Sequence, residues 1–258
     1  MPLTFPLEYC REYEMICLQR FHLRSSLLLF VFSMVLHLNC YDHFKVYQVE
    51  KIEVNRKIML EDPFEKIQLP ALLTAIEFFA TPVSKNNKKI KQPEAHLTWY
   101  RMQVDGPHPT RRVTFTNQFG TQSWKIGAPV YLLVPTEKIE FGSALPEKLN
   151  CFQCYRVLSD DSLTIKVIFM DQFDQKAGKK QIAVVRKPLY LGVPVKQNNT
   201  AIVHPDFYLA CYLVTPIEMN PPLKQVTIRN QFGQCLLQVQ NSLILGVPSK
   251  IKQVEEVK

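Results

Sequence analysis

Hydrophobic and polar residues alternate along much of the chain after residue 40, with the period of two that is typical of β-strands. In the stretch RVTFTN, Val113 and Phe115 fall on one face, and Thr114 and Thr116 fall on the other. Proline is frequent, at 18 residues, while glycine is scarce, at 8. This balance fits strands that end at prolines. The pattern therefore predicts an all-β protein.

Three short patterns recur four times in the same order, which is the signature of internal repeats. A strand with a central tyrosine comes first, at Tyr47, Tyr100, Tyr155 and Tyr212, with intervals of 53, 55 and 57 residues. A turn of the form Asx-Gln/Pro-Phe follows, at 62–65, 117–120, 171–174 and 230–233. A strand that ends in proline closes each copy, at Pro82, Pro135, Pro194 and Pro248. The sequence thus predicts four diverged copies of a unit of about 55 residues, with about four short strands in each.

We expect each Asx-Gln/Pro-Phe turn to close a β-hairpin, with the Asx side chain accepting a bond from the backbone two residues on. The phenylalanine would plug the end of the sheet, and a glycine would adopt a positive φ. The turn residues are Asp62, Phe64, Asn117, Phe119, Gly120, Asp171, Phe173, Asn230, Phe232 and Gly233. Carboxylates at three places also suggest calcium ligands, at Asp62, Asp171 and Asp174. Asparagine replaces aspartate in the other copies, so turn capping is the favoured interpretation.

One copy cannot bury both faces of its own sheet, whereas two copies supply about eight strands, enough for an ordinary core. We therefore expect two tandem β-sandwich or barrel-like domains, at 41–140 and 147–258. Polar connectors separate the copies, at 84–93, 139–149 and 196–205.

The N-terminal region contains the apolar run LLLFVFSMVLHL at 27–38, preceded by Arg20 and Arg24. This length and this basic flank are typical of a signal peptide, and the run is too short to span a membrane comfortably. Residues 1–40 are thus predicted to be an export segment outside the fold. Residues 1–14 are mixed in character, which favours Met15 as the true start.

Cys40 follows the apolar run directly, as in bacterial lipoproteins. Lipidation of Cys40 is the favoured interpretation. Simple cleavage, an uncleaved anchor, and a strand or helix of the fold remain open. The first three place the protein outside the bacterial cytoplasm, as a secreted, periplasmic or membrane-anchored protein.

The motifs DHFKVYQV, FQCYRV and LACYLV, with the exits LLVP and LGVP, resemble an uncharacterised family of secreted bacterial β-repeat domains. Members read DHFKCYKV at the first strand and LCVPxxK at the last, and the resemblance covers residues 42–250. The family has no assigned activity, so the resemblance implies fold and export only.

The same resemblance implies a cysteine in the first strand paired with one in the last. Here Cys154 and Cys211 occupy the first-strand position, but Leu133, Gly192 and Gly246 occupy the last-strand position. The staple is therefore missing, or re-routed through Cys151 and Cys235.

Cysteine chemistry stays open on the residues alone. A disulfide between Cys211 and Cys235 would lie within one copy and would suit an exported protein, while two buried free thiols are the favoured alternative. The pair Cys151 and Cys154 forms a single CxxC; a zinc ribbon needs a second pair, and a redox CxxC usually opens a helix. No Ser, Cys or Asp recurs with His43 and His96 as in a catalytic triad. We expect no cofactor.

The formal charge is +8, from 31 Lys and Arg against 23 Asp and Glu. Basic clusters lie at 85–91 and 176–187, and such a surface attracts nucleic acid, anionic lipid or acidic glycans. Solvated lysine-rich loops are the favoured interpretation, and export argues against nucleic acid.

Together these features predict a non-enzymatic extracytoplasmic module with a structural, adhesive or binding role at the cell envelope. Its partner would be an anionic envelope glycan or another surface protein, with membrane association through the N-terminus. The alternative is a hydrolase or another enzyme that acts on an extracellular polymer at a site between the two β domains. A third, less favoured hypothesis is a cytoplasmic protein with residues 27–38 in its core.

Overall fold

The computed structural model describes residues 41–85, 89–139, 145–146, 148–198, 200–217 and 224–257. Tyr41–Lys258 form one compact unit. Residues 1–40, and with them the export segment and the lipidation of Cys40, lie outside the described residues.

Antiparallel strands dominate this unit and confirm the all-β class. They are β1 (His43–Glu61), β2 (Leu69–Lys85), β3 (His96–Val104), β4 (Arg111–Asn117), β5 (Gly120–Lys138), β6 (Cys151–Val157), β7 (Ile165–Met170), β8 (Gln181–Gln197), β9 (Tyr208–Pro216), β10 (Lys224–Asn230) and β11 (Gly233–Glu256). The short helix α2 (Gln172–Lys176) follows β7. All of these strands belong to one sheet. We call β1–β2, β3–β5, β6–β8 and β9–β11 segments one to four.

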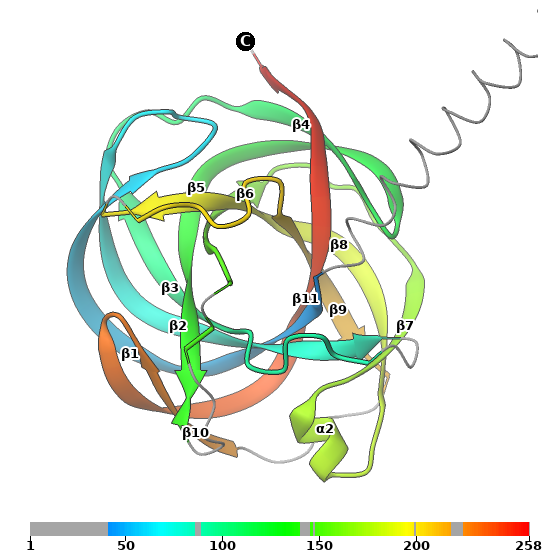
Figure 1. Ribbon diagram of the computed structural model, residues 1–258. Helices are drawn as coiled ribbons and strands as arrows, with labels where there is room; N and C mark the ends of the chain where they lie inside the picture. Colours follow the sequence, from blue (N-terminus) through cyan, green and yellow to red (C-terminus); the bar gives the residue numbers. More distant parts are fainter. Residues whose placement is uncertain are drawn as a thin grey trace, which may run out of the picture. The chain divides into compact units, whose positions relative to one another are not determined.

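The sheet closes on itself. In the order β1, β2, β3, β5, β6, β8, β9, β11, each strand pairs with the next, and β11 pairs back to β1. Figure 1 shows the strands running around a common centre. Each segment contributes its first and last strands to this ring. Closure gives every ring strand a neighbour on both sides, which removes open sheet edges from this part of the sheet.

The expected division at 140/147 into two tandem domains is therefore wrong. β5 of segment two pairs with β6 of segment three across that boundary, with Leu133 opposite Phe152. β11 of segment four pairs with β1 of segment one in the same way. Two segments supply only half of the ring and would leave two unpaired edges, so four segments close together as a single unit.

The long strands also differ from the short strands expected in each copy. The stretches 121–126 and 129–134 belong to one strand, β5, which first pairs with β4 in a hairpin and then with β3 in the ring. Register shifts around Pro129 mark the change. A bulge inserts an unpaired residue and bends a strand without ending it, so one chain segment serves both the hairpin and the ring.

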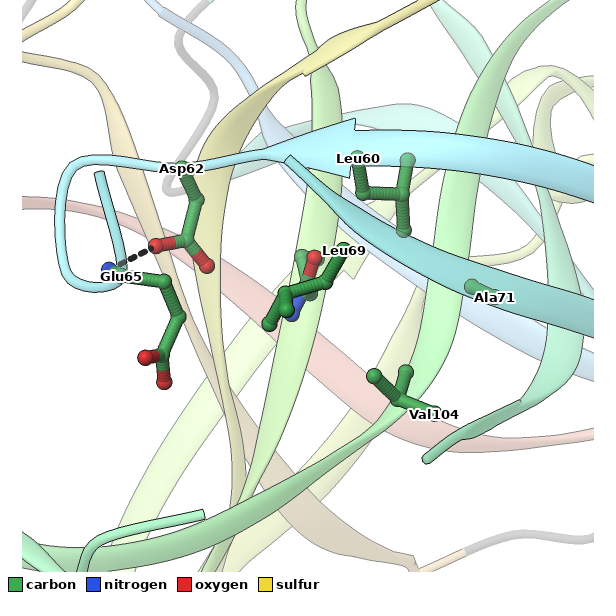
Figure 2. Close-up of a pocket in the computed structure, with 7 residues that line it drawn as sticks. Leu60, Asp62, Glu65, Leu69, Ala71 and Val104 are labelled. Atoms are coloured by element: carbon green, nitrogen blue, oxygen red, sulfur yellow. Dashed lines mark hydrogen bonds between the residues drawn. The ribbon is translucent and has the colours of Figure 1, made fainter. Parts of the chain in front are cut away.

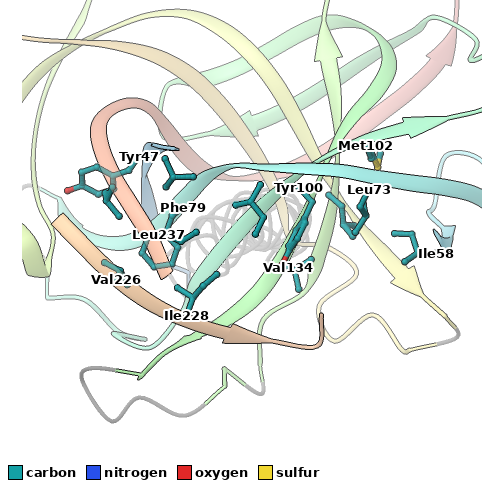
Figure 3. Packing of buried hydrophobic residues seen from close by; sticks show 14 of the residues in the cluster. Tyr47, Ile58, Leu73, Phe79, Tyr100, Met102, Val134, Val226, Ile228 and Leu237 are labelled. Carbon is teal, nitrogen blue, oxygen red and sulfur yellow. The ribbon is translucent and has the colours of Figure 1, made fainter. Parts of the chain in front are cut away.

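Alternation along the ring strands separates two core faces. One face gathers into a single cluster that includes Val46, Trp99, Cys154 and Cys211. The next residue in each case is a landmark tyrosine, and these divide between two further clusters, Tyr47 and Tyr100 in one and Tyr155 and Tyr212 in the other. Figure 3 shows the first of these, where Val226, Ile228 and Leu237 of the β10–β11 hairpin lie close to Tyr47, Phe79 and Tyr100 of the ring.

Candidate functional site

The four Asx side chains cap their turns from within. In each turn the phenylalanine N–H donates to the Asx oxygen two residues earlier, over 2.8–2.9 Å. Gly120 and Gly233 have φ values of 99° and 124°, in the left-handed region that glycine enters without strain. The turn geometry follows from local sequence.

Each turn also meets a landmark tyrosine two segments away. The hydrogen-bonded pairs are Tyr47 with Asp171, Tyr155 with Asp62, Tyr212 with Asn117, and Tyr100 with Asn230. The phenylalanine of each turn packs against the same tyrosine, with ring centroids 5.1–5.6 Å apart. We call these the Tyr–Asx contacts. They join segment one to segment three and segment two to segment four. The recurrent tyrosine, Asx and phenylalanine residues therefore all serve packing between segments.

The third turn differs from the expected hairpin, because the sequence DQFD forms helix α2. Asp171 and Asp174 form a capping box, in which each side chain accepts a bond from the other residue's N–H. The glycine that ends the turn in segments two and four is replaced by Asp174, and the left-handed position moves to Gly178, with φ 63°. Two acidic residues at the start of a helix satisfy its unpaired N–H groups.

A buried ion pair holds α2 against the ring. Lys45 on β1 donates to both carboxylate oxygens of Asp174, over 2.9 and 2.8 Å, and is 1% exposed. Tyr47 and Thr81 donate to Oδ2 of Asp171 over 2.7 and 2.8 Å. The aspartates are therefore occupied by protein donors, an arrangement that favours structural capping over the calcium hypothesis.

Nearby charges, hydrogen bonds and burial shift the pKa values of Asp171 and Asp174 in opposite directions. Burial acts to raise the pKa of Asp171, but Lys45 and the hydrogen bonds from Asp174 N–H, Tyr47 and Thr81 outweigh it and hold that pKa below its usual range. Burial and the charge of Asp171 raise the pKa of Asp174, against the opposing effect of Lys45. Of the two carboxyl groups, Asp171 therefore keeps its charge to lower pH than Asp174.

Segments two and four complete the surroundings of α2. The ammonium groups of Lys138 and Lys224 lie over the Phe173 ring, 4.9 and 4.6 Å from its centroid. Gln172 contacts Nε2 of His96 at 2.7 Å. Burial, with the charge of Lys138, lowers the pKa of His96 to about 4, so this histidine is neutral at physiological pH. Segments one, two and four therefore all contact α2, which makes this helix a packing element.

The equivalent turn of segment one surrounds Asp62 (Figure 2). Its N–H donors are those of Phe64 and Glu65, and Tyr155 donates to its other oxygen. The space between Asp62, Leu69, Val104 and neighbouring side chains has no room for a water molecule. Burial raises the pKa of Asp62, although its hydrogen bonds oppose the shift. An ionised Asp62 therefore reduces the stability of the fold at neutral pH.

The cysteines lie on different faces of the sheet. Cys211 is buried in the ring cluster, directly opposite Gly246, whereas Cys235 packs against the cluster of Tyr47 and Tyr100. All four cysteines of the described chain are free, so the Cys211–Cys235 disulfide is not formed and the two residues are free thiols, the favoured alternative. Cys154 lies opposite Gly192, and a staple between these ring positions is therefore missing, as this chain's departure from the family pattern suggested.

A groove of about 440 Å³, which no sequence motif indicated, lies where β1, β2 and the end of β3 meet the exit of β8. Its lining residues are Lys57, Ile58, Met59, Pro70, Ala71, Leu72, Gln103, Asp105 and Asn198. Asn198 fixes the rim: its Oδ1 accepts from Met59 N–H and its own N–H donates to Met59 O, both over 3.1 Å. Because Asn198 comes from segment three, only the closed ring brings this lining together.

Within the described ranges, no three His, Cys, Asp or Glu side chains gather closely enough to share a metal ion. Over the same part of the chain, no helix has the length and apolar character needed to cross a membrane.

The ring of β-hairpin segments and their shared turn contacts define a repeat protein. The chain belongs to the family described as a repeat of unknown function (DUF7450), whose model matches residues 96–248. No curated protein and no solved structure matches the chain.

Proposed function

We propose that this chain is a non-enzymatic, extracytoplasmic module of four β-repeat units that binds an envelope polymer through its groove. The groove is the observation that carries the proposal. Its volume falls in the range of roughly 300–1,000 Å³ typical of ligand sites. The proposed location of the protein outside the cytoplasm rests on the apolar segment at 27–38.

The groove lining supports a ligand that is polar and extended. Gln103 and Asn198 supply amide donors and acceptors, and Lys57 and Asp105 supply opposite charges. Met59 and Leu72 add apolar surface beside them. Hydroxyl, carboxylate and amide groups along a glycan fit such a mixed surface, and the ammonium of Lys57 favours an anionic glycan. Another surface protein is the second partner that this lining fits.

The enzyme alternative has less support. Its site was expected between two β domains, and the described chain forms one unit. Among the lining residues of the groove, Asp105 alone carries a carboxylate, whereas glycoside hydrolysis in its usual form uses two. The aspartates of α2 are buried and engaged with Lys45, Tyr47 and Thr81. These observations favour binding over turnover.

Calorimetric titration with soluble anionic envelope-glycan fragments tests the proposal. The wild-type chain should bind them, and the double variant Lys57→Gln, Gln103→Ala should bind at least about tenfold more weakly, because each lost polar contact contributes about 1 kcal/mol. Gln225→Ala, an exposed amide on β10, is the matched control and should bind like wild type.

Equal binding by the groove variant and the control would refute the groove as the site. Release of new reducing ends during the incubation would refute the non-enzymatic part and support the hydrolase.

A further inference from the structure

The hairpin of segment three, residues 165–187, presents an exclusively basic set of charges to solvent. Its six basic residues are all exposed: Lys166, Lys176, Lys179, Lys180, Arg186 and Lys187. Its two acidic residues, Asp171 and Asp174, are 0% and 4% exposed. The nearest exposed acids along the chain, Asp160 and Asp161, precede β7.

The buried acids follow from the packing of α2 described above. Asp174 faces Lys45, and Asp171 faces Tyr47 and Thr81, all on ring strands of segment one. Folding therefore withdraws both negative charges from the hairpin surface and leaves the positive ones outside. A sequence count of charge over the hairpin underestimates the positive field that the folded surface presents.

Isoleucines lie side by side on the outward face of this hairpin and on the neighbouring chain after β9. Ile168 of β7 lies opposite Ile182 of β8, and the N–H of Ile217 donates to the Ile182 carbonyl over 2.9 Å. Ile168 is 39% exposed and Ile217 is 55% exposed. Lys166 pairs with Val184 one step along the same face. Apolar and basic side chains thus alternate on one surface. We call it the basic isoleucine face; its residues are Lys166, Ile168, Ile182, Val184, Arg186 and Ile217.

We propose that the basic isoleucine face docks on the surface of an anionic phospholipid bilayer. The lysines would lie at the level of the phosphate groups, with their alkyl stems along the apolar surface. The isoleucines would enter the boundary between headgroups and acyl chains, as the apolar face of an interfacial element does. Acidic glycans and nucleic acids would satisfy the charges, but a hydrated polyanion gives the isoleucines no apolar surroundings, so the bilayer is favoured.

Tryptophan fluorescence of the full chain carrying Ile168→Trp tests the proposal. Both native tryptophans are buried, Trp99 at 0% and Trp124 at 1% exposure, so the wild-type signal can be subtracted. Vesicles that mix phosphatidylglycerol with phosphatidylcholine should shift the reporter emission to the blue, and brominated acyl chains should quench it. Pure phosphatidylcholine vesicles should do neither.

The matched reporter is Leu236→Trp, which replaces an apolar residue that is 49% exposed on the β10–β11 hairpin. That reporter should not respond, even if the N-terminal segment tethers the chain to vesicles. Adding Lys166→Gln and Arg186→Gln to the Ile168→Trp chain should weaken the partitioning about 25-fold, or about fivefold for each basic residue near the surface. The response should also fall as salt rises, because added ions screen exposed charges.

Three results would overturn the proposal. They are an equal response on neutral vesicles, an equal response at Leu236→Trp, and tight binding of a soluble sulfated glycan or of DNA without any reporter response on anionic vesicles. The groove variants should leave the vesicle response unchanged, so this test stands independently of the glycan titration.

Discussion

Replacing Lys45 by methionine should strongly destabilise the fold. Methionine has nearly the length and volume of the lysine stem, so the change removes the charge and retains most of the packing. Lys45 and Asp174 are both buried, and the ammonium contacts both carboxylate oxygens. Removal of one partner leaves the other charge buried without its counter-ion.

The structure sets the scale of the loss. Removing one partner of a buried ion pair costs about 3–5 kcal/mol. Lys45 also stabilises the ionised form of Asp171, so its loss affects a second buried carboxylate. For a unit of this size, each kcal/mol lowers Tm by roughly 2–4 °C. We therefore expect Lys45→Met to lower Tm by roughly 6–20 °C.

Thermal unfolding at pH 7, followed by the emission of Trp99 and Trp124, measures the effect as a change in Tm. The double variant Lys45→Met, Asp174→Asn should recover most of the loss, because asparagine carries no charge and can still accept the Asp171 N–H bond of the capping box. Lys51→Met is the control, since its ion pair with Glu53 is exposed and should leave the midpoint unchanged. An equal midpoint for Lys45→Met and Lys51→Met would refute the reasoning, and so would a double variant no more stable than Lys45→Met.

Two further predictions follow from the ring and its turns. Asp62→Asn should raise the urea midpoint at pH 7 and have little effect near pH 4. Burial raises the pKa of Asp62, so its ionised carboxylate opposes folding at pH values above that pKa. Asparagine suits the position, because Asn117 fills the equivalent place in segment two and its amide donates to Tyr212. A midpoint lower than wild type at pH 7 would contradict this. Gly192→Cys should form a disulfide with Cys154, its direct cross-strand partner, because a Cβ there would lie 3.5 Å from the Cys154 sulfur. Mass spectrometry of the alkylated protein would detect the disulfide, which should add up to about 4 kcal/mol of stability. Gly192→Ala, with the same Cβ and no thiol, is the control. Free thiols at both Cys154 and the new cysteine in oxidised protein would contradict the register.

The turn residues were the most informative part of the sequence. The expectation that Asn117 and Asn230 cap their turns needed only residues two or three apart, and Gly120 and Gly233 followed from the same local geometry. The expectation failed locally only at DQFD, where a second acid completes a capping box and helix α2 replaces the tight turn.

Domain organisation could not be predicted in the same way. Alternation showed that each copy has a face to bury, but it does not say against which copy. Pairing Leu133 with Phe152 or Val46 with Ile244 depends on all four segments being present. The groove had no sequence signal either, because Asn198 and Met59 are 139 residues apart.

The sequence by itself determined the β class, the recurrent landmarks and the capped turns, because these depend on side-chain alternation and on hydrogen bonds between near neighbours in the chain. Only the tertiary structure decided that Tyr47 meets Asp171 and that Tyr155 meets Asp62, across 124 and 93 residues. It also decided that the acids of α2 are buried while the lysines beside them remain exposed. The physical reason is that closing the ring brings together segments whose own sequences carry no record of their partners.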